Sequence, residues 1–120
     1  MSFDAAEGTY DQIEARLMSH GVYVTDLDPG GESDPLEVTY ETVLATEGVP
    51  NQDVGRLLNV LLAMREEGWE PERVEATAMD AEGNFLGTWH AEAEWFERLE
   101  AGDLTEIEFS QRVLDTIETD

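Results

Sequence analysis

The chain has 120 residues, with 29 Asp or Glu, six Arg, no Lys and no Cys, for a formal net charge of −23. This composition excludes disulfides and thiolate metal sites, and the lack of a basic patch argues against nucleic-acid binding. The longest apolar stretch, Val60 to Met64, is too short to span a membrane, and the N-terminus lacks the features of a signal peptide. We therefore expect one cytoplasmic domain over residues 1–120, with no membrane partner.

Three predicted helices end at glycines that can adopt the left-handed conformation, Gly21, Gly68 and Gly102. The first is expected to begin at Thr9, which forms a capping-box pattern with Gln12. The second spans residues 51–67 and is apolar except for a narrow polar stripe of Gln52, Arg56, Asn59 and Glu66. A third covers residues 94–100. The last spans residues 104–118, with a capping box of Asp103 and Glu106.

Each of the first two helices is followed by a predicted β-hairpin. The strands are residues 22–27 and 36–44, then residues 73–79 and 85–93, with turn-rich sequences between the members of each pair. The order α-β-β-α-β-β-α-α predicts an α+β fold. We expect a mainly antiparallel four-stranded sheet of two hairpins, with the helices packed on one face.

Alternation along the strands assigns side chains to the two faces of the sheet. The covered face is expected to carry apolar and small residues: Leu36, Val38, Tyr40, Val74, Ala76, Ala78, Gly87, Trp89, Ala91 and Ala93. The opposite face is semi-apolar, and an open sheet face of this kind often packs against a second copy or a partner. We expect its contact residues to be Thr39, Thr77, Met79, Leu86 and Thr88, while a plainly solvated sheet face is the alternative.

A possible metal site lies in the last predicted strand. Alternation would place His90, Glu92 and Glu94 on one face and both Trp89 and Trp95 on the other. One imidazole and two carboxylates can ligate a divalent metal. The alternative is an exposed strand face with core tryptophans behind it.

The first hairpin turn partly matches a calcium-binding loop, with candidate ligands Asp26, Asp28, Glu32, Asp34 and Glu37. Gly30 stands where a ligand is wanted, and strands rather than helices flank the segment, so a plain turn is the alternative. No phosphate-binding loop and no nucleophile motif is present, so the sequence predicts no cofactor.

The acid excess and the absence of lysine together predict a protein adapted to molar salt, because such salt screens the repulsion between carboxylates. An acidic surface for a basic partner is the alternative reading. The stretches Gly68 to Thr77 and Gly87 to Trp95 resemble short uncharacterised proteins of halophilic archaea. That resemblance implies an organism class and no functional residues. We therefore expect a non-catalytic interaction or homodimerisation module, with a small metal-dependent enzyme using His90, Glu92 and Glu94 as the alternative.

Overall fold

The computed structural model describes residues 3–28, 35–42, 48–68 and 72–119, with only the backbone described for residues 3–9. The helices and strands follow the predicted order. They are α1 (Phe3–Ser19), β1 (Tyr23–Asp28), β2 (Leu36–Thr42), α2 (Asn51–Glu66), β3 (Val74–Asp80), β4 (Phe85–Ala91), α3 (Ala93–Ala101) and α4 (Glu106–Leu114).

The four strands form one sheet in the order β1-β2-β3-β4. The pairs β1/β2 and β3/β4 are antiparallel, as the hairpins predicted, but β2 and β3 run parallel. The expectation of a mainly antiparallel sheet is therefore corrected to a mixed sheet. The cause is α2, which carries the chain back along the sheet between β2 and β3, so that both strands start from the same end.

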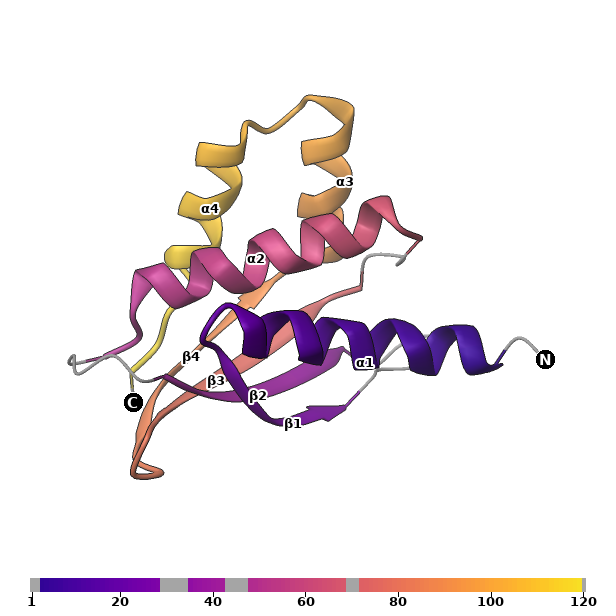
Figure 1. The fold of residues 1–120 in the computed structure, drawn as a ribbon. Helices are drawn as coiled ribbons and strands as arrows, with labels where there is room; N and C mark the ends of the chain where they lie inside the picture. The colour runs from indigo at the N-terminus through magenta and orange to yellow at the C-terminus, as the bar shows by residue number, and fades with distance from the viewer. Residues whose placement is uncertain (1–2, 29–34, 43–47, 69–71, 120) are drawn as a thin grey trace.

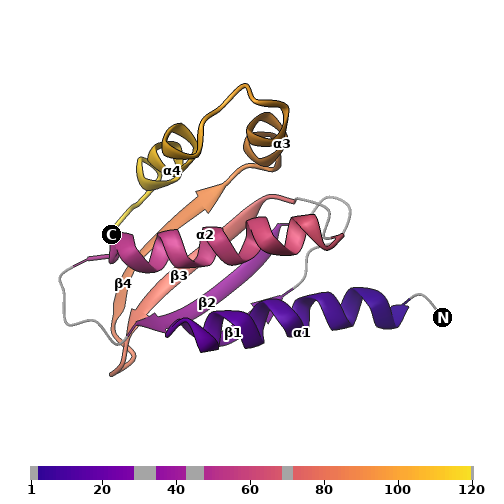
Figure 2. The same ribbon diagram turned by 45° about the horizontal axis from the view of Figure 1, so that its top comes forward.

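Helices α1 and α2 lie side by side across one face of the sheet (Figure 1). Helices α3 and α4 lie beyond β4, next to α2 (Figure 2). Between the helices and the sheet lies the core, whose largest fully buried side chains are Trp89, Tyr40, Phe96, Phe109, Ile13 and Leu17. The glycines expected to end the first three helices, Gly21, Gly68 and Gly102, all have positive φ. Among the described residues, no helix combines the length and hydropathy needed to cross a membrane.

The predicted start of the first helix and both predicted ends of the last helix are wrong. Helix α1 begins at Phe3, so Thr9 lies inside the helix instead of capping it. Helix α4 begins at Glu106, where Thr105 and Glu108 form the capping box, because the Thr105 hydroxyl accepts the backbone N–H of Glu108 at 3.1 Å. It also ends at Leu114, which frees the last residues to return to the sheet.

The C-terminal segment, residues 115–119, runs along the outer edge of β4. Thr88 and Glu118 exchange two backbone hydrogen bonds, of 2.8 and 2.9 Å. Gly87 permits this close approach, because a Cβ at that position would lie 2.7 Å from the carbonyl oxygen of Glu118. The segment thus closes an edge that would otherwise expose unpaired backbone groups.

Candidate functional site

The outer face of the sheet, which is the side opposite α1 and α2, is the candidate site. Buried and half-buried residues alternate along β3 and through most of β4, and the predicted inner residues are buried except Ala93, which is half-buried at the start of α3. The predicted contact residues Thr39, Thr77, Met79, Leu86 and Thr88 are all half-buried on the outer face. The division into two faces is therefore confirmed, whereas a role in contacts stays a prediction.

Strand register arranges the outer side chains in rows across the sheet. Thr39 pairs with Thr77, and Thr77 pairs with Thr88, which together form a threonine row. One step along, Glu37 pairs with Glu75, and Glu75 pairs with His90, which form a charged row. On the other side of the threonine row, Glu41 pairs with Met79. The pairing of β3 with β4 is irregular here, because its register shifts after Ala78, and Leu86 lies at this irregularity.

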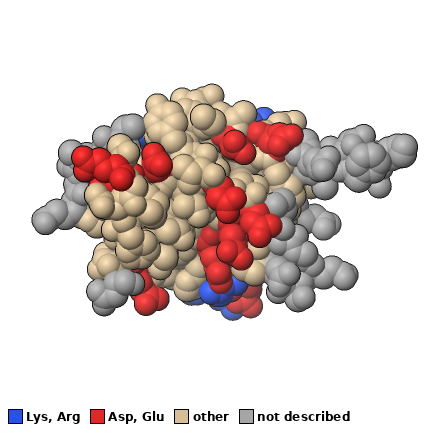
Figure 3. Space-filling model, turned by 90° about the horizontal axis from the view of Figure 1, so that it is seen from below, with Lys and Arg blue, Asp and Glu red and all other residues tan. Residues whose placement is uncertain are grey.

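Charge is unevenly spread over this side of the molecule (Figure 3). Acidic side chains gather in a band with basic side chains at one end, and a broad area beside the band carries neither kind. Such an area is notable in a chain with 29 acidic residues, because carboxylates elsewhere would oppose close contact with another acidic surface. The uncharged area is the part of this face best suited to close packing.

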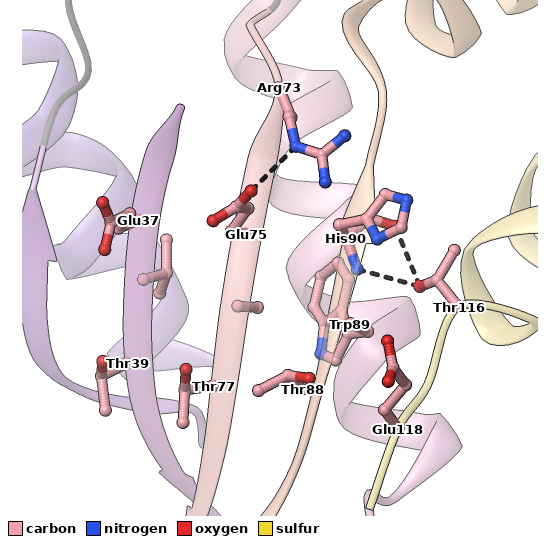
Figure 4. A pocket seen from close by; sticks show the side chains of 12 residues that line it. Glu37, Thr39, Arg73, Glu75, Thr77, Thr88, Trp89, His90, Thr116 and Glu118 are labelled. Atoms are coloured by element: carbon pink, nitrogen blue, oxygen red, sulfur yellow. Dashed lines mark hydrogen bonds and ion pairs between the residues drawn. The ribbon is translucent and has the colours of Figure 1, made fainter. Parts of the chain in front are cut away.

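A hollow of about 280 Å³ lies between the outer face and the C-terminal segment. The three hydroxyls of the threonine row line it on one side, and Thr116 and Glu118 line it on the other (Figure 4). The side chain of Thr116 anchors this wall, because its Oγ1 accepts the backbone N–H of His90 at 2.9 Å. The hollow is polar, and its hydroxyls can both donate and accept hydrogen bonds.

Arg73 holds the charged end of the hollow in place. Its Nε donates to Oε2 of Glu75 at 2.9 Å, and its Nη1 donates to Glu92. The hydrogen bond to Glu75 contributes most to raising the pKa of Arg73 above its ordinary value, and the hydrogen bond to Glu92 raises it further. The guanidinium therefore stays charged and neutralises part of the acidic row.

Trp95 does not lie behind the sheet with Trp89, as the alternation predicted. Strand β4 ends at Ala91, and α3 begins at Ala93 with Trp95 in its first turn. The Trp95 ring stacks on His90 with 5.9 Å between centroids, and the Arg112 guanidinium lies 6.0 Å from the ring centroid. The prediction failed because the change from strand to helix breaks the period of two.

The same break separates the three predicted metal ligands. Nε2 of His90 lies 3.4 Å from Oε2 of Glu92, so these two side chains do meet. Glu94 lies on α3, exposed, and its nearest basic partner is Arg98 at 3.9 Å. No group of three potential metal-binding side chains is found in the described part of the chain. The metal site was the alternative reading of this strand, and of its three residues only His90 and Glu92 come together.

The calcium-like segment is only partly described. Asp26 and Asp28 lie on β1 and Glu37 lies on β2, where Asp28 and Glu37 are direct cross-strand partners. Glu32 and Asp34 lie outside the described residues. The flanking elements are strands, as the sequence predicted.

Both edges of the sheet are poorly suited to a further strand. At the β4 edge, the backbone N–H and C=O of Thr88 are already hydrogen-bonded to the C-terminal segment. The β1 edge carries Asp26 and Asp28, and its register shifts between Val24 and Asp26. Charge and a bulge are features that protect an edge from strand addition.

Sequence reasoning missed two residues of the site, Thr116 and Glu118. Both were assigned to the last helix, which the structure ends at Leu114. A capping box of Thr105 and Glu108 could have placed the start of this helix, but no such signal in the sequence marks its end at Leu114. Arg73 was assigned only to a strand, and its two acidic partners come from different elements.

The fold and this face define an α+β protein with one open sheet surface and, among the described residues, no group of three metal ligands. The chain matches the model of the family described as "Domain of unknown function (DUF8159)" over residues 4–120, and it belongs to that family. The comparisons with curated proteins and with solved structures gave no match.

Proposed function

We propose that this protein is a non-catalytic interaction module of a high-salt cytoplasm, in halophilic archaea, and that its outer sheet face packs against a second copy. The observation that carries the proposal is the threonine row, Thr39, Thr77 and Thr88. It sets three uncharged side chains at the centre of the outer face of a chain with net charge −23. The methyl groups of threonine can be buried, and its hydroxyls find partners across an interface.

A second copy suits this face because of how its rows are ordered. A two-fold axis across the strands at Thr77 would bring the two threonine rows together. Glu75 of each copy would then lie opposite Met79 of the other, and His90 opposite Leu86. A two-fold axis along the strands would instead place Glu75 of one copy opposite Glu75 of the other.

The same axis sets Glu37 opposite Glu41 of the other copy, which links association to salt. At about 1 M salt the Debye length falls to roughly 3 Å, so repulsion between these carboxylates is strongly screened. The net charge of −23 on each copy opposes association in dilute buffer for the same reason. The proposed dimer therefore forms more readily as salt rises.

Size-exclusion chromatography with light scattering, over a concentration series, tests the proposal in dilute and in molar KCl. We expect a mass of twice 13.4 kDa in molar KCl. Thr77→Arg places a charge in the centre of the threonine row and should return the protein to a monomer. Gln111→Arg, at an exposed position of α4, is the matched control and should leave the dimer intact. A mass of one chain at every concentration and salt level would contradict the proposal.

A further inference from the structure

A second hollow lies in the helical layer between α1 and α2, on the other side of the molecule from the outer face. Its volume is about 150 Å³, and the residues that line it are Arg16, His20, Arg56, Asn59, Val60 and Ala63. The chain has only six arginines and two histidines, and three of these side chains meet here. None of the acidic residues that the structure describes lines the hollow, although Asp and Glu make up 29 of the 120 residues. The lining itself thus carries cationic side chains and no described carboxylate, although Asp53 and Glu67 lie next to its two arginines.

Arg56 extends from α2 to the end of α1. Its Nη1 lies 3.5 Å from the place that a Cβ on Gly21 would occupy, directly after His20. It also lies 3.5 Å from Oδ1 of Asp53, at the limit of a hydrogen bond. Within the described part of the chain, the Arg56 side chain has no other hydrogen bond or ion pair, and it is 34% exposed. Most of its donors are therefore available to a ligand.

Arg16 approaches the hollow from α1. Its Nη2 lies 2.6 Å from Oε2 of Glu67, and both side chains are partly exposed, at 36% and 48%. An ion pair this exposed to water contributes little to stability. An anion in the hollow can therefore share or displace Glu67 at small cost.

The other two polar groups add donors of different geometry. His20 is exposed just after α1, and its imidazole has at least one N–H in either protonation state. Asn59 is exposed on α2, and its amide group supplies two further N–H donors. Donors from two helices thus border one small volume.

We infer that this hollow binds a phosphate group, either free phosphate or the phosphate of a small monoester. Arginine presents paired N–H donors that match phosphate oxygens, and charge-assisted bonds of this kind are strong. Two guanidiniums, an imidazole and an amide suit the several oxygens of a tetrahedral anion better than the two coplanar oxygens of a carboxylate. A purely structural role is the alternative, in which the cations only complement the C-terminal end of α1.

Titration of ¹⁵N-labelled protein in KCl, followed by NMR, tests the inference with inorganic phosphate, glycerol 3-phosphate and acetate. We expect saturable shifts at the side chains of Arg16, Arg56 and Asn59 and at the amides of His20 and Gly21. Tighter binding of inorganic phosphate would identify free phosphate as the ligand, and tighter binding of glycerol 3-phosphate would identify a small monoester. Acetate should bind about tenfold more weakly or worse, because it satisfies fewer donors.

Arg56→Gln should weaken phosphate binding at least about tenfold. Arg98→Gln is the matched control, because Arg98 is exposed on α3 and pairs only with Glu94 at 3.9 Å among the described residues. Asn59→Ala repeats the test at an exposed position where folding is not at risk. Shifts that do not saturate, that spread equally to Arg98, or that persist unchanged in both Arg56→Gln and Asn59→Ala would overturn the inference. Equal affinity for acetate would overturn the assignment to phosphate.

Discussion

The indole of Trp89 donates a hydrogen bond of 3.0 Å to the hydroxyl of Tyr40 in the buried core. Trp89 lies on β4 and Tyr40 on β2, so the two rings meet above β3. The neighbours on β3 are Ala76 and Ala78, whose small side chains leave room for them. Burial raises the pKa of Tyr40 to about 12.

Tyr40→Phe should lower the free energy of unfolding by about 1–3 kcal/mol, because it leaves the buried N–H of Trp89 without an acceptor. Urea unfolding followed by tryptophan fluorescence measures the change. Tyr23→Phe, on the 43% exposed side chain of β1, is the control and should change stability by less than about 0.5 kcal/mol. Equal effects of the two substitutions would show that the bond contributes nothing.

The raised pKa of Tyr40 also predicts a loss of stability at alkaline pH. The unfolded chain releases the phenolic proton near its ordinary value of 10.0, while the folded protein keeps it to about 12. The stability that this pKa difference of Tyr40 contributes is therefore complete below about pH 10, and it is lost as the pH rises to about 12. It amounts to about 2–3 kcal/mol at 1.36 kcal/mol per pKa unit. Urea unfolding across this range should show the loss in the wild type and not in Tyr40→Phe, and an equal loss in both would refute this assignment.

Two glycine-to-alanine substitutions should change stability in opposite directions. Gly87→Ala brings a methyl group within 2.7 Å of both the Glu118 carbonyl oxygen and Cγ2 of Val49, which should cost about 1–3 kcal/mol. Gly55→Ala, inside α2 where the new methyl meets no atom within 4 Å beyond the adjoining helix backbone and chain neighbours, should stabilise the protein by up to about 1 kcal/mol. Thermal unfolding of both variants measures this. Hydrogen exchange at Thr88 and Glu118 should also accelerate in Gly87→Ala, and unchanged exchange there would speak against the packed C-terminal segment.

Calorimetric titration with Zn²⁺ and Mn²⁺ tests the remaining metal hypothesis. Because only His90 and Glu92 approach each other, with Arg73 already bonded to Glu92, we expect no tight binding that depends on His90. His90→Ala should therefore leave the titration unchanged. A stoichiometric site that disappears in His90→Ala would restore the metal-dependent alternative.

The melting temperature should rise steeply from dilute buffer to molar KCl, because screening relieves the self-repulsion of a chain with net charge −23. Differential scanning calorimetry over a KCl series measures it. The same series in sorbitol separates screening from general solute effects. A melting temperature that does not respond to KCl would refute the predicted adaptation to high salt.

Much of the sheet could be predicted from the sequence, because alternation in β2, β3 and β4 is regular. Val38, Ala76 and Trp89 were assigned to the covered face and are buried there. The parallel pairing of β2 with β3 was missed, since it depends on where α2 crosses the sheet and not on any residue pattern within the strands. Local pattern determines the face of a side chain, whereas the path of the chain determines strand direction.

The site was only partly predictable for a related reason. The threonine row lies on the face that alternation gave it, but its register comes from pairing over long sequence distances. Trp95 could not be placed, because the chain turns from strand to helix between Ala91 and Ala93. Arg56 and Asn59 were recognised as a polar stripe of α2, yet their proximity to Arg16 and His20 emerges only when α1 and α2 pack together.

Whether the outer face contacts a second copy is tested most directly by NMR of a mixture of isotope-labelled and unlabelled chains in molar KCl. Signals filtered for contacts between copies should come from the methyl groups of Thr39, Thr77, Thr88 and Met79. Filtered contacts that are absent, or that come instead from a site such as Ile107, which is 80% exposed on α4, would contradict the proposed contact.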